Sequence, residues 1–441
     1  MRPIFRVRLP VLLTVVASLV VVCPNTTGSV FADDWPNWRG PDYNGVSAET
    51  GWRTDWTKNV PKQLWKKSVG AGYSSISVSK GRVYTIGNRN KEDTVWCLSA
   101  DSGKVLWRRS YPCDAGTYSS GAYGGPRATP TVDGKNVYTL SHDGQVFCLE
   151  ADSGEVVWSR NLQKELPAKP PRWGFAGSPL VEGKMLILNM GTSGVALDKA
   201  TGKIIWKTGS GIAGYTTPVP FTMGSTRCLA FCNVDSLVVL NAADGKEIWR
   251  KERKVAYDVH ASDPIISGNK MFISSGANTG CSLLRIDGEE PAVLWQNKQM
   301  RNYFNDCVLW KGHIYGFDRF NRSTLKCLDF LTGDVRWSKE KLGRNCSFMI
   351  ADGKMIVMNG LGTLIVADAS PDGYRELGRV KILSGICWSV PVLSDGKIFC
   401  RNYNGELLCL QVRPETTQAG NERKTEKNSP DKKEASKEQA K

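Results

Sequence analysis

Residues 100–107 read Ala-Asp-Ser-Gly-Lys-Val-Leu-Trp, and this segment decides the fold because it recurs along the chain. It returns at residues 151–158 as Ala-Asp-Ser-Gly-Glu-Val-Val-Trp and at residues 199–206 as Lys-Ala-Thr-Gly-Lys-Ile-Ile-Trp. A degraded seventh copy has Leu377 in the tryptophan position, and three further copies end at Trp249, Trp295 and Trp337. Eight copies between residues 63 and 412 give about 44 residues each, a period typical of repeat architectures.

Each copy also contains an earlier strand that starts with a small residue and a proline, as at Thr129-Pro130, Ser178-Pro179, Thr217-Pro218 and Asp263-Pro264. Four short strands with glycine turns between them are typical of a propeller blade. The sequence therefore predicts an all-β, eight-bladed β-propeller. The eighth copy ends without a tryptophan strand, and residues 61–66, Pro-Lys-Gln-Leu-Trp-Lys, match that strand. We expect them to complete the last blade and to hide two sheet edges.

The repeat resembles the pyrroloquinoline-quinone (PQQ) type of β-propeller repeat, whose blades are locked by an Ala-x-Asp-x-x-Thr-Gly-x-x-x-Trp docking motif. In such a motif the turn glycine permits a backbone conformation that is costly for other residues, and the indole fills the gap between neighbouring blades. The resemblance therefore implies a structural docking role for Trp107, Trp158, Trp206, Trp249, Trp295 and Trp337.

The chain divides into four parts. Residues 1–32 have a basic start, an apolar stretch and a small residue at Ala32, so we predict a signal peptide cleaved after Ala32 and a periplasmic or secreted protein. A lipoprotein acylated at Cys23 is the alternative. Residues 33–62 form an arm that resembles the one in secreted PQQ-binding-like propeller proteins sometimes labelled polyvinyl-alcohol dehydrogenase, and its tryptophans are expected to pack on the ring. Residues 63–412 form the propeller, and residues 413–441 a disordered charged tail.

Composition and charge exclude several function classes. The net charge is +15, but the basic residues recur singly, so no nucleic-acid surface is expected. Only three histidines are present, none in a His-Glu-x-x-His pair, so we predict no metal site. The fingerprint Gly209-x-Gly211-x-x-Gly214 is followed by two prolines that prevent the helix a dinucleotide site needs. We expect a monomer, with an association with the cell envelope left open.

Most of the thirteen cysteines are expected to be buried packing residues. One disulfide is predicted. A two-residue hairpin at Asn404-Gly405 would place Cys400 directly opposite Cys409 at a non-hydrogen-bonded pair, close enough for a bridge.

Two kinds of relative with this fold imply different functions. Quinoprotein dehydrogenases are expected to carry two adjacent cysteines over the quinone and carboxylate and amide groups that hold calcium. This chain has no Cys-Cys pair, so no cofactor is predicted, and PQQ with calcium belongs only to the alternative of an alcohol or polyvinyl-alcohol dehydrogenase. The other relative is the periplasmic lipoprotein of the outer-membrane β-barrel assembly machine, which binds partners and catalyses nothing.

Alignment of the blades on the proline of the first strand brings one residue per blade to one mouth of the central channel, namely Tyr73, Arg127, Phe175, Tyr215, His260, Phe304, Arg344 and Trp388. We predict that the guanidinium of Arg127 binds an anionic group, with Tyr73, Tyr215 and Trp388 as stacking partners. His260 and Arg344 are secondary polar contacts. The alternative is that these residues pair with one another and Arg127 serves backbone carbonyls.

The prediction is therefore an exported binding or scaffold protein that takes a protein partner or a small anionic or carbohydrate-like ligand at the channel mouth.

Overall fold

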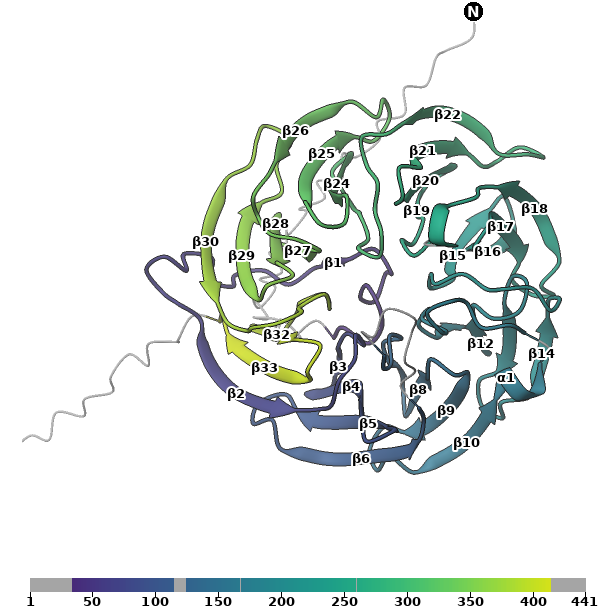
Figure 1. Ribbon diagram of the computed structural model, residues 1–441, viewed down its shortest axis with the longest axis horizontal. Coiled ribbons are helices and arrows are strands. Elements are labelled where there is room, and N and C mark those ends of the chain that lie inside the picture. The colour runs from purple at the N-terminus through teal and green to yellow at the C-terminus, as the bar shows by residue number, and fades with distance from the viewer. Residues whose placement is uncertain (1–33, 115–123, 167, 259, 414–441) are drawn as a thin grey trace, which may run out of the picture. The chain divides into compact units, whose positions relative to one another are not determined.

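The computed structural model describes residues 34–114, 124–166, 168–258 and 260–413, and these residues form a ring of eight antiparallel sheets (Figure 1). The predicted all-β, eight-bladed propeller is confirmed. The only helices in the described part of the chain are α1 (Leu162–Glu165) and the 3-10 turn Ala256–Asp258. Neither is long or apolar enough to cross a membrane.

Each of the first four blades is one continuous stretch of chain with four strands, numbered outward from the channel. Their bounds are β3 (Ser77–Ser79), β4 (Arg82–Arg89), β5 (Glu92–Ser99) and β6 (Val105–Pro112) in blade 1; β7 (Thr131–Asp133), β8 (Asn136–Leu140), β9 (Gln145–Glu150) and β10 (Val156–Asn161) in blade 2; β11 (Leu180–Glu182), β12 (Met185–Leu188), β13 (Val195–Asp198) and β14 (Ile204–Lys207) in blade 3; and β15 (Val219–Met223), β16 (Thr226–Cys232), β17 (Ser236–Asn241) and β18 (Glu247–Glu252) in blade 4.

The last four blades follow the same order, with two additions from the N-terminal part of the chain. Their bounds are β19 (Ile265–Ser267), β20 (Lys270–Ser275), β21 (Gly280–Arg285) and β22 (Ala292–Asn297) in blade 5; β23 (Val308–Trp310), β24 (His313–Asp318), β25 (Thr324–Asp329) and β26 (Val335–Lys339) in blade 6; β27 (Ser347–Ala351), β28 (Lys354–Met358), β29 (Thr363–Asp368) and β30 (Glu376–Lys381) in blade 7, joined by β1 (Val46–Ser47); and β31 (Val392–Ser394), β32 (Lys397–Arg401), β33 (Glu406–Gln411) and β2 (Lys62–Ser68) in blade 8.

The ring is closed by β2, as the sequence predicted. It pairs antiparallel with β33, with Lys62 opposite Gln411 and Ser68 opposite Glu406. The last blade thus joins the two ends of the propeller sequence, and the outer edge of β33 is covered. In Figure 1 the purple β2 lies beside the yellow β33.

Neighbouring blades are joined by the tryptophan of one blade and the turn of the next. The indole N–H donates to a backbone carbonyl of the following blade in six cases: Trp65 to Ala100, Trp107 to Ala151, Trp158 to Lys199, Trp206 to Ala242, Trp295 to Phe330 and Trp337 to Ser370. At one such turn Gly245 has φ +70°, and an added Cβ would lie 2.6 Å from the Trp206 ring. The recurring glycine is therefore required both by the left-handed backbone and by contact with the indole.

The loss of tryptophan in the seventh repeat has a structural explanation. Because β2 supplies the outer strand of blade 8, that blade has no turn between its third and fourth strands for a blade 7 tryptophan to dock on. Leu377 stands at this position, and Trp56 of the arm is buried against Gly378 of β30 and belongs to the same core cluster as blade 8. The arm thus supplies the aromatic group that the repeat lacks here.

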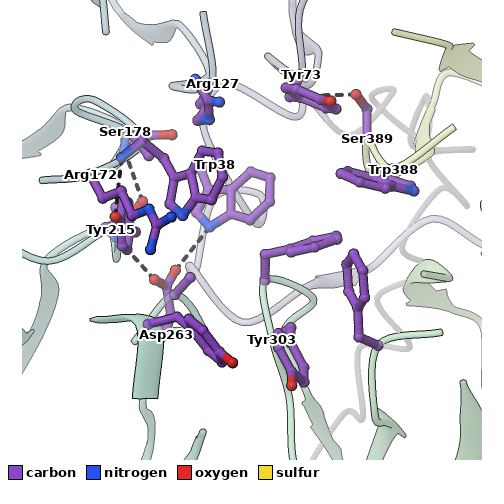
Figure 2. Close-up of a pocket in the computed structure, with 17 residues that line it drawn as sticks. Trp38, Tyr73, Arg127, Arg172, Ser178, Tyr215, Asp263, Tyr303, Trp388 and Ser389 are labelled. Atoms are coloured by element: carbon purple, nitrogen blue, oxygen red, sulfur yellow. Dashed lines mark hydrogen bonds between the residues drawn. The ribbon is translucent and has the colours of Figure 1, made fainter. Parts of the chain in front are cut away.

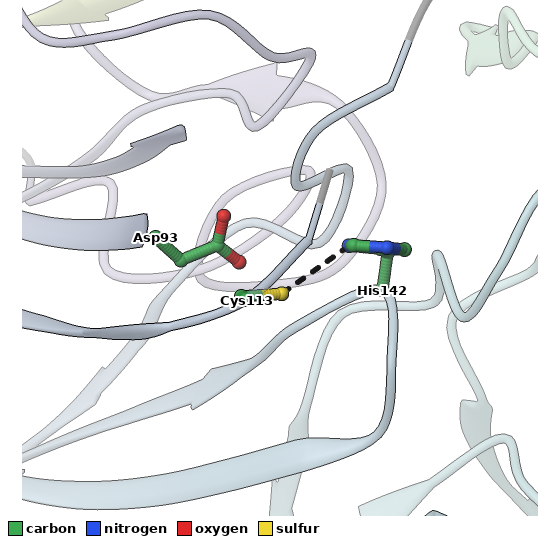
Figure 3. Close-up of side chains that lie close together, drawn as sticks. All are labelled: Asp93, Cys113 and His142. Carbon is green, nitrogen blue, oxygen red and sulfur yellow. Dashed lines mark hydrogen bonds between the residues drawn. The ribbon is translucent and has the colours of Figure 1, made fainter. Parts of the chain in front are cut away.

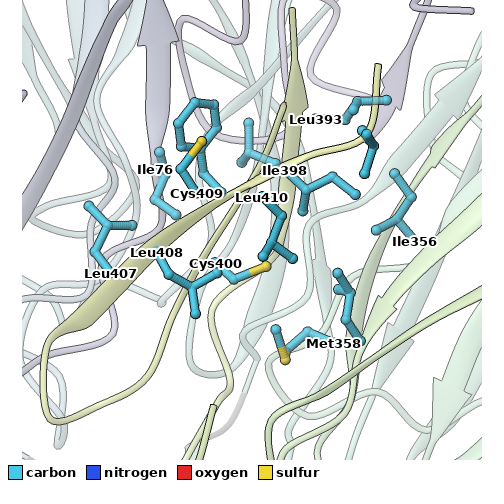
Figure 4. Packing of buried hydrophobic residues seen from close by; sticks show 14 of the residues in the cluster. Ile76, Ile356, Met358, Leu393, Ile398, Cys400, Leu407, Leu408, Cys409 and Leu410 are labelled. Atoms are coloured by element: carbon cyan, nitrogen blue, oxygen red, sulfur yellow. The ribbon is translucent and has the colours of Figure 1, made fainter. Parts of the chain in front are cut away.

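The predicted disulfide is wrong. Asn402 N–H donates to the carbonyl of Glu406 and the strands pair Cys400 with Leu408 and Phe399 with Cys409, so the loop has three residues instead of two. Gly405, with φ +86°, takes the left-handed position of such a loop. The shift by one residue sends the two side chains to opposite faces of the sheet, and both thiols are free and buried (Figure 4).

Trp206 and Trp249 provide a matched test of the docking hydrogen bond. Both indoles are buried, but the Trp249 N–H has no partner among the described residues. We predict that Trp206→Phe lowers the free energy of unfolding by about 1 kcal/mol more than Trp249→Phe does, since only Trp206 loses a hydrogen bond. Urea unfolding measures the difference, and equal losses would contradict the role of the bond.

Candidate functional site

A ring of hydrogen bonds, here called the polar girdle, surrounds the channel just before the innermost strands. In blades 1 to 5 a backbone N–H donates to a side chain of the next blade: Ser75 to Thr129, Thr129 to Ser178, Ser178 to Thr217, Thr217 to Asp263 and Asp263 to Asp306, over 2.7–3.1 Å. From blade 6 back to blade 1, side chains donate to backbone carbonyls: Asn305 to Cys346, Ser347 to Ser389 and Ser389 to Tyr73. The small residue before the proline in the repeat is therefore an acceptor for the preceding blade.

Blades 5 and 6 contribute carboxylates to the girdle where the earlier blades have hydroxyls. Asp263 and Asp306 are both buried beside the channel. Two adjacent buried carboxylates need compensation, and the arm provides it. The Trp38 indole N–H donates to Asp263 Oδ2 at 2.8 Å, and Arg39 Nη1 lies 2.9 Å from Asp306 Oδ2.

The arm contacts the ring at several places between residues 34 and 56. Asp34 accepts hydrogen bonds from Ser79 and Lys80 of blade 1, and Trp35 pairs with Val78. Further along, Tyr43 packs on the cluster formed by blades 3 and 4, and β1 pairs in parallel with β27. Because these contacts lie where the innermost strands turn into the second strands, the arm closes one end of the channel.

The open end of the channel holds a cavity of about 480 Å³. Its described lining comes from every blade except the seventh, and from the arm: Trp38, Tyr73, Arg127, Arg172, Trp173, Ala176, Ser178, Tyr215, Thr217, Tyr257, Ala261, Asp263, Tyr303, Phe304, Phe320, Trp388 and Ser389. Trp38 also borders a void of about 20 Å³ between the arm and the innermost strands. Trp38, whose indole is drawn bonded to Asp263 in Figure 2, therefore lies between the cavity and this void.

Four of the six predicted site residues line this cavity together: Tyr73, Arg127, Tyr215 and Trp388. Tyr73 stacks on Trp388 with ring centroids 5.4 Å apart, and the Arg127 guanidinium lies 5.5 Å from the centre of the Tyr73 ring. Arg127 Nη1 also donates to the carbonyl of Gly125 at 3.0 Å. These contacts are the ones named as the alternative, in which the residues pair with one another and Arg127 serves a backbone carbonyl. The stacking of Tyr73, Tyr215 and Trp388 on a ligand stays a prediction.

The other two predicted site residues, His260 and Arg344, are not among the described residues that line the cavity. The alignment of the blades was therefore wrong in placing them at the channel mouth. His260 is buried, its Nε2 is 2.8 Å from Ser275 Oγ, and burial next to Arg253 lowers the pKa of its imidazole to about 3. Arg344 is exposed at the surface. Gly343 and Asn345 on either side of it both have positive φ, so the chain kinks at this entry to blade 7.

Sequence reasoning missed several cavity residues. Phe320 follows β24 of blade 6, and its ring meets both Phe304 and Trp388. Arg172 and Trp173 lie three and two residues before the aligned Phe175, which is itself buried. The run Pro170-Pro171-Arg172-Trp173 was a usable signal, because two prolines fix the chain ahead of a cationic and an aromatic side chain.

The charge of the cavity is set by its guanidinium groups. Arg172 lies over the Trp173 ring at 5.4 Å and is exposed. Asp263 is the single carboxylate in the described lining, and both its oxygens accept hydrogen bonds, from Trp38 and Thr217. Burial and the neighbouring Asp306 raise the pKa of Asp263 well above its usual range. The cavity is therefore aromatic and cationic, and an anionic group is the complementary ligand.

The described lining does not fit PQQ with calcium. No cysteine is among the described lining residues, so the paired thiols expected over the quinone have no counterpart there. Calcium takes six to eight oxygen ligands, whereas the one lining carboxylate already accepts two hydrogen bonds.

Comparisons with known proteins agree with this fold. The chain matches the family model described as outer membrane protein assembly factor BamB over residues 46–188 and 91–339. The BamB protein of Moranella endobia is 24% identical over 374 residues, which cover 79% of this chain and 90% of that protein. The crystal structure of BamB from Moraxella catarrhalis superposes with a TM-score of 0.57 at 13% identity, covering 80% of this chain and 98% of that one. A quinohemoprotein alcohol dehydrogenase from Comamonas testosteroni superposes with a TM-score of 0.67, also at 13% identity, over 88% of this chain and 82% of that one.

Arg39 is predicted to hold the arm in the channel. Burial alone would lower the pKa of its guanidinium, but Asp306 and Asp263 hold that pKa above its usual value. Arg39→Met leaves two buried carboxylates without a cation, so we expect the free energy of unfolding to fall by about 3–5 kcal/mol at neutral pH. Lys58→Met, an exposed change in the same arm, should alter it by less than about 0.5 kcal/mol.

The decrease in the free energy of unfolding caused by Arg39→Met should also depend on pH. Without the guanidinium the folded-state pKa of Asp263 rises further, and a carboxyl with a raised folded-state pKa contributes stability at low pH that is lost as the pH rises through that pKa. Chemical unfolding across the pH range should therefore show the gap between variant and wild type narrowing toward acid. A gap that is constant or widens toward acid would contradict the assignment.

Proposed function

Because the chain belongs to the family described as outer membrane protein assembly factor BamB, we propose that it is a non-catalytic binding protein of the cell envelope that holds an acidic segment of a partner protein in the channel-mouth cavity. The export signal and the cleavage after Ala32 are part of this proposal. Asp34 is the first residue with a described contact to the ring, so a chain cleaved after Ala32 would keep the arm contacts described above.

The observation that carries the proposal is the convergence of aromatic rings and two guanidinium groups on one cavity. Tyr73 stacks on Trp388, and the Phe304 ring meets Trp388 at a tilt with ring centroids 4.8 Å apart. Arg127 and Arg172 are the two cationic residues in the described lining. Planar guanidinium groups suit carboxylates, and exposed ring faces suit apolar or cyclic groups.

The size of the cavity favours side chains over a folded surface. At about 480 Å³ it lies within the range of small-ligand pockets and has room for a few side chains of an extended segment. A free anionic or carbohydrate-like molecule has the same recognition chemistry and is the second candidate. The relatives are named as assembly factors, and a partner protein bound by such a factor would supply an extended segment of this kind.

A peptide-display selection tests this proposal. We expect sequences with acidic residues next to aromatic or aliphatic ones to be enriched on the mature chain. Arg172→Met should weaken their binding by about tenfold or more, the loss of one charge-assisted hydrogen bond, without changing the melting temperature. Arg127→Met should do the same.

Arg344→Met is the matched control, because that guanidinium is exposed and lies outside the described lining. It should bind the selected peptides as the wild type does. Selection of peptides without acidic residues, or binding that survives both cavity substitutions, would contradict the proposal. Enrichment of free sugars or small acids in a parallel ligand screen, with no peptide bound, would favour the second candidate.

A further inference from the structure

Three side chains with metal-binding atoms meet between blades 1 and 2, outside the cavity lining. Asp93 lies on β5, Cys113 follows β6 and His142 follows β8 (Figure 3). One ligand atom from each lies within 4.8 Å of the other two, and all three residues are buried. The sequence showed no motif here, because the three positions are widely spaced and only the pairing of strands brings them together.

The spacing of two of these atoms suits a shared ion. Cys113 Sγ lies 3.5 Å from His142 Nδ1. A tetrahedral zinc ion with a sulfur ligand at about 2.3 Å and a nitrogen ligand at about 2.1 Å separates the two ligand atoms by about 3.6 Å. A carboxylate oxygen of Asp93 lies within 4.8 Å of both atoms, so a small side-chain movement would bring it into the same coordination sphere.

The carboxylate of Asp93 is the second observation that points to an ion. Its side chain is fully buried, and Oδ1 accepts a hydrogen bond from Asn88 at 2.7 Å. The neighbour of the carboxylate on its other side is the Cys113 thiol, and no lysine or arginine forms an ion pair with Asp93 within the described residues. A buried carboxylate without a cation is costly, and a divalent ion would remove that cost.

We propose that Asp93, Cys113 and His142 bind one divalent transition-metal ion of the zinc class, with water as the fourth ligand. Mixed nitrogen, sulfur and oxygen donors suit Zn²⁺, whereas calcium and magnesium prefer oxygen alone. Asn88 holds the carboxylate through Oδ1 and also donates to the carbonyl of Cys113, so it orients two of the ligands.

The ion would join two blades beside the cavity. Asp93 and Cys113 belong to blade 1 and His142 to blade 2. The carbonyl of His142 also accepts a hydrogen bond from the N–H of Phe175, whose neighbour Ala176 lines the cavity. A metal here would therefore fix the blade interface on which that part of the cavity wall depends.

Cobalt titration tests the site directly. The mature chain is prepared without a histidine tag, reduced, stripped with a chelator and titrated with Co²⁺. We expect one equivalent to bind with a thiolate-to-cobalt charge-transfer absorption, to be displaced by Zn²⁺, and Zn²⁺ to raise the melting temperature. His142→Ala and Cys113→Ser should weaken binding by more than the roughly 10–100-fold that follows loss of an outer hydrogen-bond partner.

Cys97→Ala is the matched control, because Cys97 is an equally buried thiol of blade 1 outside the cluster. It should keep the absorption and the stoichiometry. The proposal is overturned if the folded wild-type chain shows no charge-transfer band at one equivalent of Co²⁺, or if folded His142→Ala binds Co²⁺ as the wild type does. The wild-type titration decides the matter even where a variant does not fold.

Discussion

The backbone N–H and carbonyl groups just before the innermost strands face a channel in which no further strand can pair with them, and the structure depends on how they are satisfied. The polar girdle is the solution, because each blade offers a side-chain or backbone partner to its neighbour. Thr129 shows the arrangement: its hydroxyl accepts from blade 1 while its own N–H donates to Ser178 of blade 3. Each blade is thereby fixed by the blades on both sides, in addition to the tryptophan docking at the rim.

The positions of the arm and the cavity both depend on the two blades in which carboxylates replace the hydroxyls of the girdle. Asp263 and Asp306 keep the hydrogen bonds of the girdle but add buried negative charge, which Trp38 and Arg39 compensate from the arm. The arm therefore has a defined position inside the channel. It leaves a blind cavity whose one described carboxylate is already hydrogen-bonded, so the guanidinium groups of Arg127 and Arg172 set the charge that a ligand meets.

Sequence reasoning succeeded where a feature follows from the pattern of the repeat. The docking tryptophans, the closing strand β2 and the inward position of Tyr73 and Trp388 all follow from a local pattern that the repeat imposes. It failed where one blade departs from the others. Positive φ angles at Gly343 and Asn345 mark the kink at Arg344, and one extra loop residue shifts Cys400 away from Cys409.

Contacts between distant parts of the chain could not be predicted from the sequence either. Trp38 and Asp263 are 225 residues apart, and no spacing rule connects the arm to a blade whose girdle residue is acidic. The same holds for Phe320, which reaches the cavity from an inter-strand turn, a position that the alignment of blade entries did not include.

Hydrogen exchange of the mature chain, followed by mass spectrometry, tests most directly whether the arm is an integral part of the ring. The account predicts that amides of residues 34–49 exchange as slowly as those of β3 and β27, with which Trp35 and β1 are paired, and that they open only with the whole propeller. Exchange of the arm at the rate of an unstructured peptide, while the innermost strands stay protected, would contradict it.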